Sequence, residues 1–248
     1  MDKNLNIYGI HTILEAIKAG KHIEKVWLLK SNKGSLFQRL ENSIRENNIS
    51  HSYVPKERLE RFKNKNHQGA VASLSQIKFI DIEEMVQKGI KESKSPTFLI
   101  LDSITDPRNL GAIMRSAAAT GVNGVIIPQT GSAPVNAAAI KTSSGGAFLV
   151  PISRVSHLKD VFFFMKSEKI KIVGVTEKSN DIAYDINLKG PVAFLFGSEE
   201  KGINLNLLKQ CDCKIKLPMI TSLDSLNVSV ACGIVLYEKL RQNGNNSV

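Results

Sequence analysis

Residues Leu217–Leu240 read LPMITSLDSLNVSVACGIVLYEKL. Proline lacks an amide hydrogen, and the short polar residues after it bond nearby backbone, so this part favours a tight polar loop. From Val228 onward, apolar residues recur at three- and four-residue spacing, the period of a helix packed against a neighbour. The stretch therefore predicts a loop followed by a long apolar helix, with Ser225 or Asn227 as the N-cap. An ordinary capped helix would explain the same residues, so a function must be sought upstream.

The residues upstream of this stretch alternate between apolar strand patterns and helical patterns. Strands are expected at residues 97–101, 124–127, 171–176, 192–196 and 214–217, and helical segments at 110–120, 135–142, 158–168 and from 206. Strands that alternate with helices indicate an α/β domain built on a parallel sheet.

A smaller α/β unit is predicted for residues 1–78. Its helices are expected at residues 12–19, 36–47 and 56–62, and its strands at 25–29, 52–55 and 69–74. Residues 79–95 hold one short helical pattern and end in the polar, proline-terminated run KGIKESKSP, which is typical of a linker. The expected organisation is therefore a domain at 1–78, a linker at 79–95 and a larger domain at 96–248.

Net charge points to a polyanionic partner. The chain of 248 residues has a formal charge of +10 and a pI near 9.5, and a basic surface of this kind is typical of RNA-binding proteins. In residues 1–95, 17 Lys and Arg against 11 Asp and Glu give +6, so the smaller part is the more basic. Ordinary solvated surfaces also carry surplus lysine, so charge alone does not decide for RNA.

Three cysteines without paired spacing suggest neither a zinc site nor a disulfide framework. No run of about eighteen apolar residues is present, and the N-terminus has no apolar stretch typical of a signal peptide. The sequence therefore predicts a cytoplasmic protein with no metal and no membrane contact.

Three motifs occur in a fixed order: DSITDPRNLGAIMRSAAATG at 102–121, FLFGSEEKG at 194–202, and LPM followed by SLNVSVA from Leu217. Together they resemble the SpoU (TrmH) family of RNA ribose 2′-O-methyltransferases, of the SPOUT superfamily. YGIHTILEAI near the start and HQGAVA at 67–72 are similar to the subgroup that methylates a guanosine of 23S ribosomal RNA. The resemblance implies a ribosomal-protein-like RNA-binding domain first, then a domain with a deep trefoil knot. It also implies S-adenosylmethionine as cofactor and a homodimer.

The resemblance also implies which residues hold the cofactor. Gly197 and Gly202 flank SEEK at the end of an apolar strand, where glycine lets backbone approach a ligand, although a plain strand-to-helix turn would look the same. The cofactor-binding residues carried over from the motifs are Thr176, Gly197, Gly202, Leu217, Met219 and Leu226. Thr221 stands where the family commonly has glycine, which puts cofactor affinity in question. Glu200 and Lys201 are interpreted as surface residues.

The catalytic residues implied by the motifs are Asn109, Arg115, Glu199, Ser225 and Asn227. Asn109 could instead cap a helix, and Arg115 could be a solvated side chain, but the residues around Arg115 are mostly apolar or small. Arginine suits a bidentate grip on phosphate, and its pKa is too high for a general base, so Arg115 is expected to clamp RNA.

Two alternatives stay open on the sequence alone. One is a ribose methyltransferase acting on transfer RNA or on another ribosomal site, including an antibiotic-resistance type. The other is an RNA-binding ribosome-assembly factor without catalysis.

Overall fold

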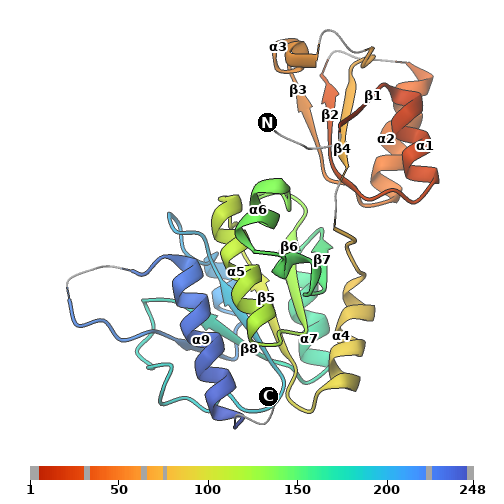
Figure 1. The fold of residues 1–248 in the computed structure, drawn as a ribbon. Helices are drawn as coiled ribbons and strands as arrows, with labels where there is room; N and C mark the ends of the chain where they lie inside the picture. The colour runs from red at the N-terminus through yellow and green to blue at the C-terminus, as the bar shows by residue number, and fades with distance from the viewer. Residues whose placement is uncertain (1–5, 31–33, 63–65, 75–76, 222–224, 245–248) are drawn as a thin grey trace. The chain divides into compact units, whose positions relative to one another are not determined.

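The structure is a computed structural model that describes residues 6–30, 34–62, 66–74, 77–221 and 225–244. It divides into two compact units, Met1–Lys78 with Pro134–Ala137 and Phe79–Ala133 with Ala138–Val248. Figure 1 shows the chain coloured from the N-terminus to the C-terminus. Among the described residues, no helix is both long and apolar enough to cross a bilayer. Nor, in those ranges, do three or more His, Cys, Asp or Glu side chains gather as metal ligands.

The first unit is a four-stranded mixed sheet in the order β1-β4-β2-β3. Its elements are β1 (Asn6–Tyr8), α1 (Ile10–Lys18), β2 (Ile23–Leu29), α2 (Ser35–Glu46), β3 (His51–Val54), α3 (Lys56–Leu59), η1 (Glu60–Phe62) and β4 (Ala70–Leu74). Apolar residues of α1 and α2, such as Ile13 and Leu40, pack on Val26, Leu28 and Ala72 of the sheet to form its core. This unit has the predicted α/β class.

The two N-terminal motifs meet at the start of α1. Gly9 has φ +88°, and the Gln68 side-chain oxygen accepts the amide hydrogen of Ile10 at 3.2 Å. The Gly9 amide donates to the Ala70 carbonyl at 3.0 Å. HQGAVA thus provides hydrogen-bond acceptors for backbone amides of YGIHT at the start of α1. These hydrogen bonds hold the two motifs side by side.

The second unit is a six-stranded parallel sheet in the order β10-β8-β9-β5-β6-β7. The strands are β5 (Thr97–Leu101), β6 (Gly124–Pro128), β7 (Ile152–Val155), β8 (Lys171–Val175), β9 (Val192–Phe196) and β10 (Cys213–Ile215). All residues of β5 and β9 are buried, as expected of strands covered on both faces. The predicted α/β class with a parallel sheet is confirmed.

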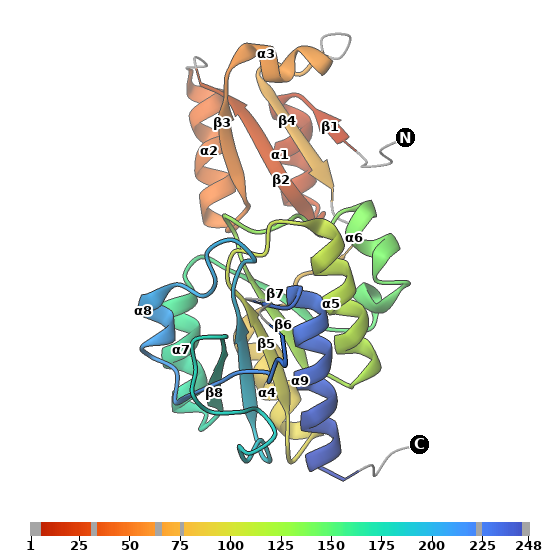
Figure 2. The same cartoon turned by 90° about the vertical axis from the view of Figure 1, so that its left-hand side faces the viewer.

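Helices cover both faces of this sheet. They are α4 (Ile82–Glu92), α5 (Pro107–Ala119), α6 (Ala137–Thr142), α7 (Leu158–Ser167), α8 (Leu205–Leu208) and α9 (Val228–Gln242), with a 3-10 turn η2 (Gly146–Phe148). Residues Val86 of α4, Phe162 of α7 and Leu208 of α8 share one core cluster with the sheet. Figure 2 shows α5 and α9 side by side on the opposite face. The sheet thus presents the carboxyl ends of β5 and β9 between two helical layers, where ligands bind in such folds.

The linker expected at residues 79–95 is corrected by the structure. Asp81 caps α4 by accepting the amides of Glu83 and Glu84, and Met85 and Val86 are fully buried against the sheet. The segment belongs to the second unit. Its lysines and glutamates lie on the solvent side of one amphipathic helix. They make the composition of the segment polar, so the apolar stripe does not stand out in the sequence.

Candidate active site

A tight hairpin follows β9. The Gly202 amide donates to the Ser198 carbonyl at 2.8 Å, and the Lys201 amide donates to the Ser198 hydroxyl at 3.1 Å. A Cβ on Gly197 would stand 2.1 Å from the carbonyl carbon of Gly202, and Gly202 itself has φ +66°. The backbone therefore favours glycine at both positions. This favours a loop shaped for close approach of a ligand over a plain strand-to-helix turn.

This hairpin forms one wall of a pocket of about 290 Å³. The other walls are the end of β8, the segment after β10 and the start of α9. The six residues predicted to bind the cofactor all line it: Thr176, Gly197, Gly202, Leu217, Met219 and Leu226. We call this space the cofactor pocket, after the role predicted for these residues. Residues that are far apart in the sequence meet here because β8 and β9 are adjacent in the sheet.

The lining of the cofactor pocket suits an amphipathic ligand. Apolar side chains such as Val175, Ile203 and Met219 can cover an aromatic ring, and Glu177 and Lys216 offer opposite charges. Because Gly197 and Gly202 lie close together and have no side chains, the backbone at the end of β9 is open to a ligand. S-adenosylmethionine has an adenine ring, a sulfonium and a zwitterionic amino acid, and these residues fit that combination. Of the loop that ends at Ser225, Ser222 and Asp224 lie outside the described residues.

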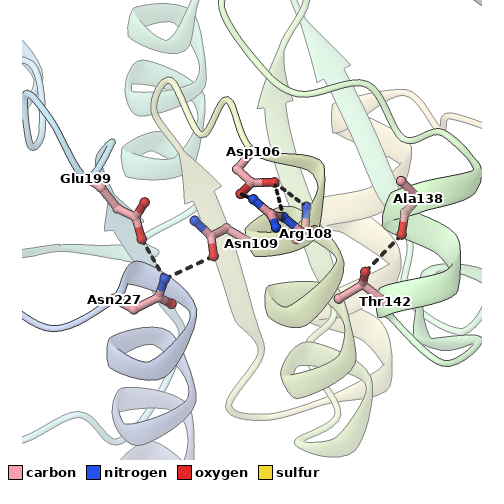
Figure 3. Close-up of polar contacts among 7 residues, drawn as sticks. All are labelled: Asp106, Arg108, Asn109, Ala138, Thr142, Glu199 and Asn227. Carbon is pink, nitrogen blue, oxygen red and sulfur yellow. Dashed lines mark hydrogen bonds and ion pairs between the residues drawn. The ribbon is translucent and has the colours of Figure 1, made fainter.

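Beside the pocket, Asn227 connects three distant segments (Figure 3). Its side-chain nitrogen donates to the Asn109 oxygen at 3.1 Å and to the Glu199 carboxylate at 2.6 Å. Its side-chain oxygen accepts from the amide and the hydroxyl of Ser229, at 2.9 and 2.6 Å, and so caps α9 as predicted. Three of the predicted catalytic residues are therefore hydrogen-bonded to one another.

Asn109 is available for this network because it does not cap α5. Asp106 is the N-cap and accepts the Arg108 amide at 2.8 Å, and Pro107 occupies the first turn, where its missing amide costs nothing. The alternative in which Asn109 merely caps the helix is therefore wrong. Ser225 lies on the lining of the cofactor pocket together with Leu226 and Glu199.

Arg115 lies apart from the other four predicted catalytic residues. Its exposed side chain is on α5, in a shallow depression that it shares with Val230, Gly233 and Tyr237 of α9. It is absent from the lining of the cofactor pocket. Within one chain, the structure thus groups Asn109, Glu199 and Asn227 and leaves the guanidinium on the outer face of α5.

Sequence reasoning missed a second cavity on the other side of the hairpin. It measures about 350 Å³ and is lined by Ser103, Ile104, Thr105, Asp106, Asn109, Gly131, Ser198, Glu199, Glu200, Lys201 and Val228. Glu200 and Lys201, expected to be plain surface residues, line both cavities. One signal for this cavity was present in the sequence: SITD follows directly after β5. Loops at the carboxyl ends of neighbouring parallel strands lie at the same edge of the sheet, so SITD could be expected to lie near the loop after β9.

Comparison with known proteins identifies the family of this chain. The model of the SpoU rRNA Methylase family matches residues 96–237. A second model, described as RNA 2′-O ribose methyltransferase substrate binding, matches residues 6–79. The chain belongs to the SpoU rRNA methylase family.

Individual relatives match over nearly the whole chain. RlmB of Shewanella oneidensis, a 23S rRNA (guanosine-2′-O-)-methyltransferase, is 34% identical over 247 residues, 98% of this chain and 99% of that protein. A putative TrmH family tRNA/rRNA methyltransferase of Bacillus subtilis is 30% identical over 236 residues, 95% of each chain. Among solved structures, the SpoU methyltransferase AviRb of Streptomyces viridochromogenes, in complex with AdoMet, gives a TM-score of 0.63 at 23% identity, covering 97% of this chain and 91% of that one. This last likeness concerns the fold.

The Asn227 side chain has two roles that two variants can separate. Its oxygen caps α9, and its nitrogen donates to Asn109 and Glu199. Asn227→Ala removes both the helix cap and the contacts to Asn109 and Glu199, so it should lower unfolding stability by about 1 kcal/mol and also lower methyl transfer and cofactor affinity. Asn227→Asp keeps the cap but loses both donated hydrogen bonds. We expect it to unfold near the wild-type temperature and still to be impaired in transfer, measured by calorimetry and labelled-methyl incorporation. Wild-type turnover in both variants would remove Asn227 from the site.

Proposed function

We propose that this protein is an RNA ribose 2′-O-methyltransferase that uses S-adenosylmethionine, with a guanosine of 23S ribosomal RNA as its target in the cytoplasm. One observation carries the proposal. The Asn109–Asn227–Glu199 network lies directly beside a pocket lined by every residue that the motifs assign to the cofactor. The name of the RlmB relative, which covers both units, supports the choice of 23S ribosomal RNA and guanosine.

Positioning is most of the work in this reaction. Backbone groups at Gly197, Leu217 and Leu226 would hold the cofactor, with Met219 and Thr176 against its sides. When bound, the cofactor supplies a methyl group on a cationic sulfur, which needs only a 2′-oxygen in line with it. Asn109 and Glu199 offer an amide and a carboxylate to orient the ribose, and Asn227, which donates to both, holds them in place.

Arg115 and Ser225 complete the proposed catalytic set. Arg115 would clamp an RNA phosphate from the outer face of α5, where its guanidinium is exposed to solvent. Ser225 lies on the cofactor pocket and offers a hydroxyl to substrate or loop. Proton loss from the 2′-hydroxyl would go to a neighbouring acceptor or to water rather than to arginine.

The two units would divide this task. We propose that residues 1–78 bind RNA substrate, in line with the substrate-binding model that matches residues 6–79. Residues 79–248 would carry the chemistry, with the chain after β10 threaded as a trefoil knot around the cofactor pocket.

A direct test incubates the protein with labelled cofactor and unmodified 23S ribosomal RNA or transfer RNA. Label should enter 23S RNA, while transfer to tRNA alone would support the second candidate, which the tRNA/rRNA name of the Bacillus subtilis relative suggests. Binding of S-adenosylmethionine, measured by calorimetry, excludes the non-catalytic assembly factor if it is strong and favours that factor if it is absent.

We also propose a homodimer through α9. Val230 and Tyr237 of α9 are 50% and 56% exposed, and they line the depression that also holds Arg115 of α5, so Arg115 would stand at the rim of this interface with its guanidinium free to reach RNA. A two-fold interface would use this same face on each chain.

A charge in the middle of that face should break the dimer. Light scattering should give twice the 27.3 kDa chain mass for the wild type and the single-chain mass for Val230→Glu at micromolar concentration. Phe163→Glu is the matched control, because Phe163 is 81% exposed on α7, in the opposite helical layer. A wild-type monomer, or a Val230→Glu dimer, would contradict the proposed interface.

A further inference from the structure

The second cavity adjoins the cofactor pocket across a single hairpin. Ser198, Glu199, Glu200, Lys201 and Val228 line both spaces. The opposite wall of the second cavity is the turn after β5, and Asn109, which is hydrogen-bonded to Asn227, lies on its lining. A molecule in this cavity would therefore lie against the proposed catalytic network and next to the cofactor.

The two walls of this cavity are fixed to each other through Asp102. Its carboxylate accepts the Asn204 amide at 2.8 Å, just past the hairpin, and the Ser103 hydroxyl at 3.0 Å. The Asp102 amide donates to the Phe196 carbonyl at 2.8 Å, just before the hairpin. Asp102 is only 9% exposed. The cavity is thus a preformed feature of the fold.

The polar groups of the cavity are mainly hydrogen-bond acceptors. Asp106, Glu199 and Glu200 contribute carboxylates, against the single lysine Lys201. Phosphate would be repelled by this lining, whereas a group rich in N–H donors would be attracted. Among the four bases, guanine alone presents adjacent N1–H and N2–H donors on one edge, which a carboxylate can accept in parallel.

Two of the three carboxylates already have partners. Glu199 accepts from Asn227 at 2.6 Å, and Asp106 pairs with Arg108 at 3.0 Å. Arg108 also holds the pKa of Asp106 below its usual value, so that carboxyl stays ionised near neutral pH. For Glu200, no hydrogen bond or ion pair is present within the described part of the chain, so its carboxylate is available to a ligand.

Resting on the proposed function, we propose that this cavity receives the acceptor nucleoside, flipped out of the RNA, and that Glu200 selects guanine by accepting its N1–H and N2–H. Asn109 and Glu199 then face the ribose, and the phosphates stay outside. Enzymes that do chemistry on a base flip it out of the stack into a shaped pocket. The same movement would let this cavity read the base while the ribose faces the cofactor.

The test uses the full chain and a synthetic RNA spanning the mapped acceptor, with guanosine or inosine at that one position. Inosine lacks the N2 amino group, so wild-type kcat/KM should fall about tenfold to a hundredfold with inosine, the cost of one hydrogen bond to a charged acceptor. Glu200→Ala should lose activity on guanosine and reduce the guanosine-to-inosine ratio to about two or less. Glu200→Gln, which keeps one acceptor, should give an intermediate ratio.

Glu177→Ala is the matched control. Glu177 is an exposed glutamate that lines the cofactor pocket and is absent from the lining of the second cavity, so the base ratio should stay at its wild-type value whatever happens to overall rate. Equal wild-type activity on guanosine and inosine, or an unchanged ratio in Glu200→Ala, overturns the assignment of Glu200 while the proposed function stands. A protein that binds no S-adenosylmethionine and methylates no RNA overturns both.

Discussion

Arg115→Ala should reduce methyl transfer by at least about 10²-fold while the affinity for S-adenosylmethionine stays nearly unchanged. The reason is positional. Arg115 is exposed on α5 and is absent from the cofactor-pocket lining, so its removal takes away a charge that acts on RNA and not on the cofactor. Arg115→Lys should recover little activity, because an ammonium cannot reproduce a bidentate grip on phosphate.

Calorimetry with S-adenosylmethionine and single-turnover methyl transfer measure the two effects separately. Arg241→Ala is the control, since Arg241 is an exposed arginine near the end of α9 that pairs with Glu238 and lies away from the pockets described. It should leave both quantities near wild type. Loss of cofactor affinity in a folded Arg115→Ala protein would show that the residue has been given the wrong role.

Removal of the first unit should have the second large effect. The fragment to test begins at Phe79 and not at residue 96, because α4 is buried against the sheet of the second unit. Residues 79–248 have their own core and cofactor pocket, so the fragment should fold, dimerise and bind cofactor. It should fail to methylate RNA at low concentration, through lost affinity and positioning rather than lost chemistry.

A salt series measures this loss. Lys30, Lys56 and Arg58 are exposed in the first unit, and the Lys30 amide donates to the Val54 carbonyl at 3.1 Å, which brings the ends of β2 and β3 together near α3. Lys63 and Lys65, from the same basic stretch, lie outside the described residues. RNA affinity of the full chain should fall with salt by roughly 0.9 or less in log-log slope per phosphate contact, and the fragment should show a smaller slope. Equal RNA affinity and equal activity for the fragment and the full chain would contradict the assignment of RNA binding to the first unit.

Much of the fold could be predicted because its strands are short apolar runs and its helices have apolar residues at three- and four-residue spacing. β5 and β9 were predicted at their observed bounds, since strands buried on both faces are apolar throughout. β1 and β7 were missed. β1 has only three residues and exists by pairing with β4. In β7, two polar residues separate Ile152 from Val155, so neither strand has a recognisable pattern without its neighbours.

The candidate site was predicted as a set of residues but not as an arrangement. The motifs indicated Asn109, Glu199 and Asn227, and the structure shows them hydrogen-bonded across 28 and 118 positions of sequence. Such contacts depend on strand order, which the periodicity of a single chain does not encode. The role of Asp102 in joining two loops, and the cavity beside it, were hidden for the same reason.

Nucleoside analysis of the RNA product is a direct test of ribose methylation. The protein is incubated with unmodified 23S ribosomal RNA and isotopically labelled S-adenosylmethionine, and the RNA is digested to nucleosides for mass spectrometry. We expect one labelled product, 2′-O-methylguanosine, with the label on the ribose fragment. Label on a base fragment, or no labelled nucleoside from a protein that is folded and binds the cofactor, would contradict it.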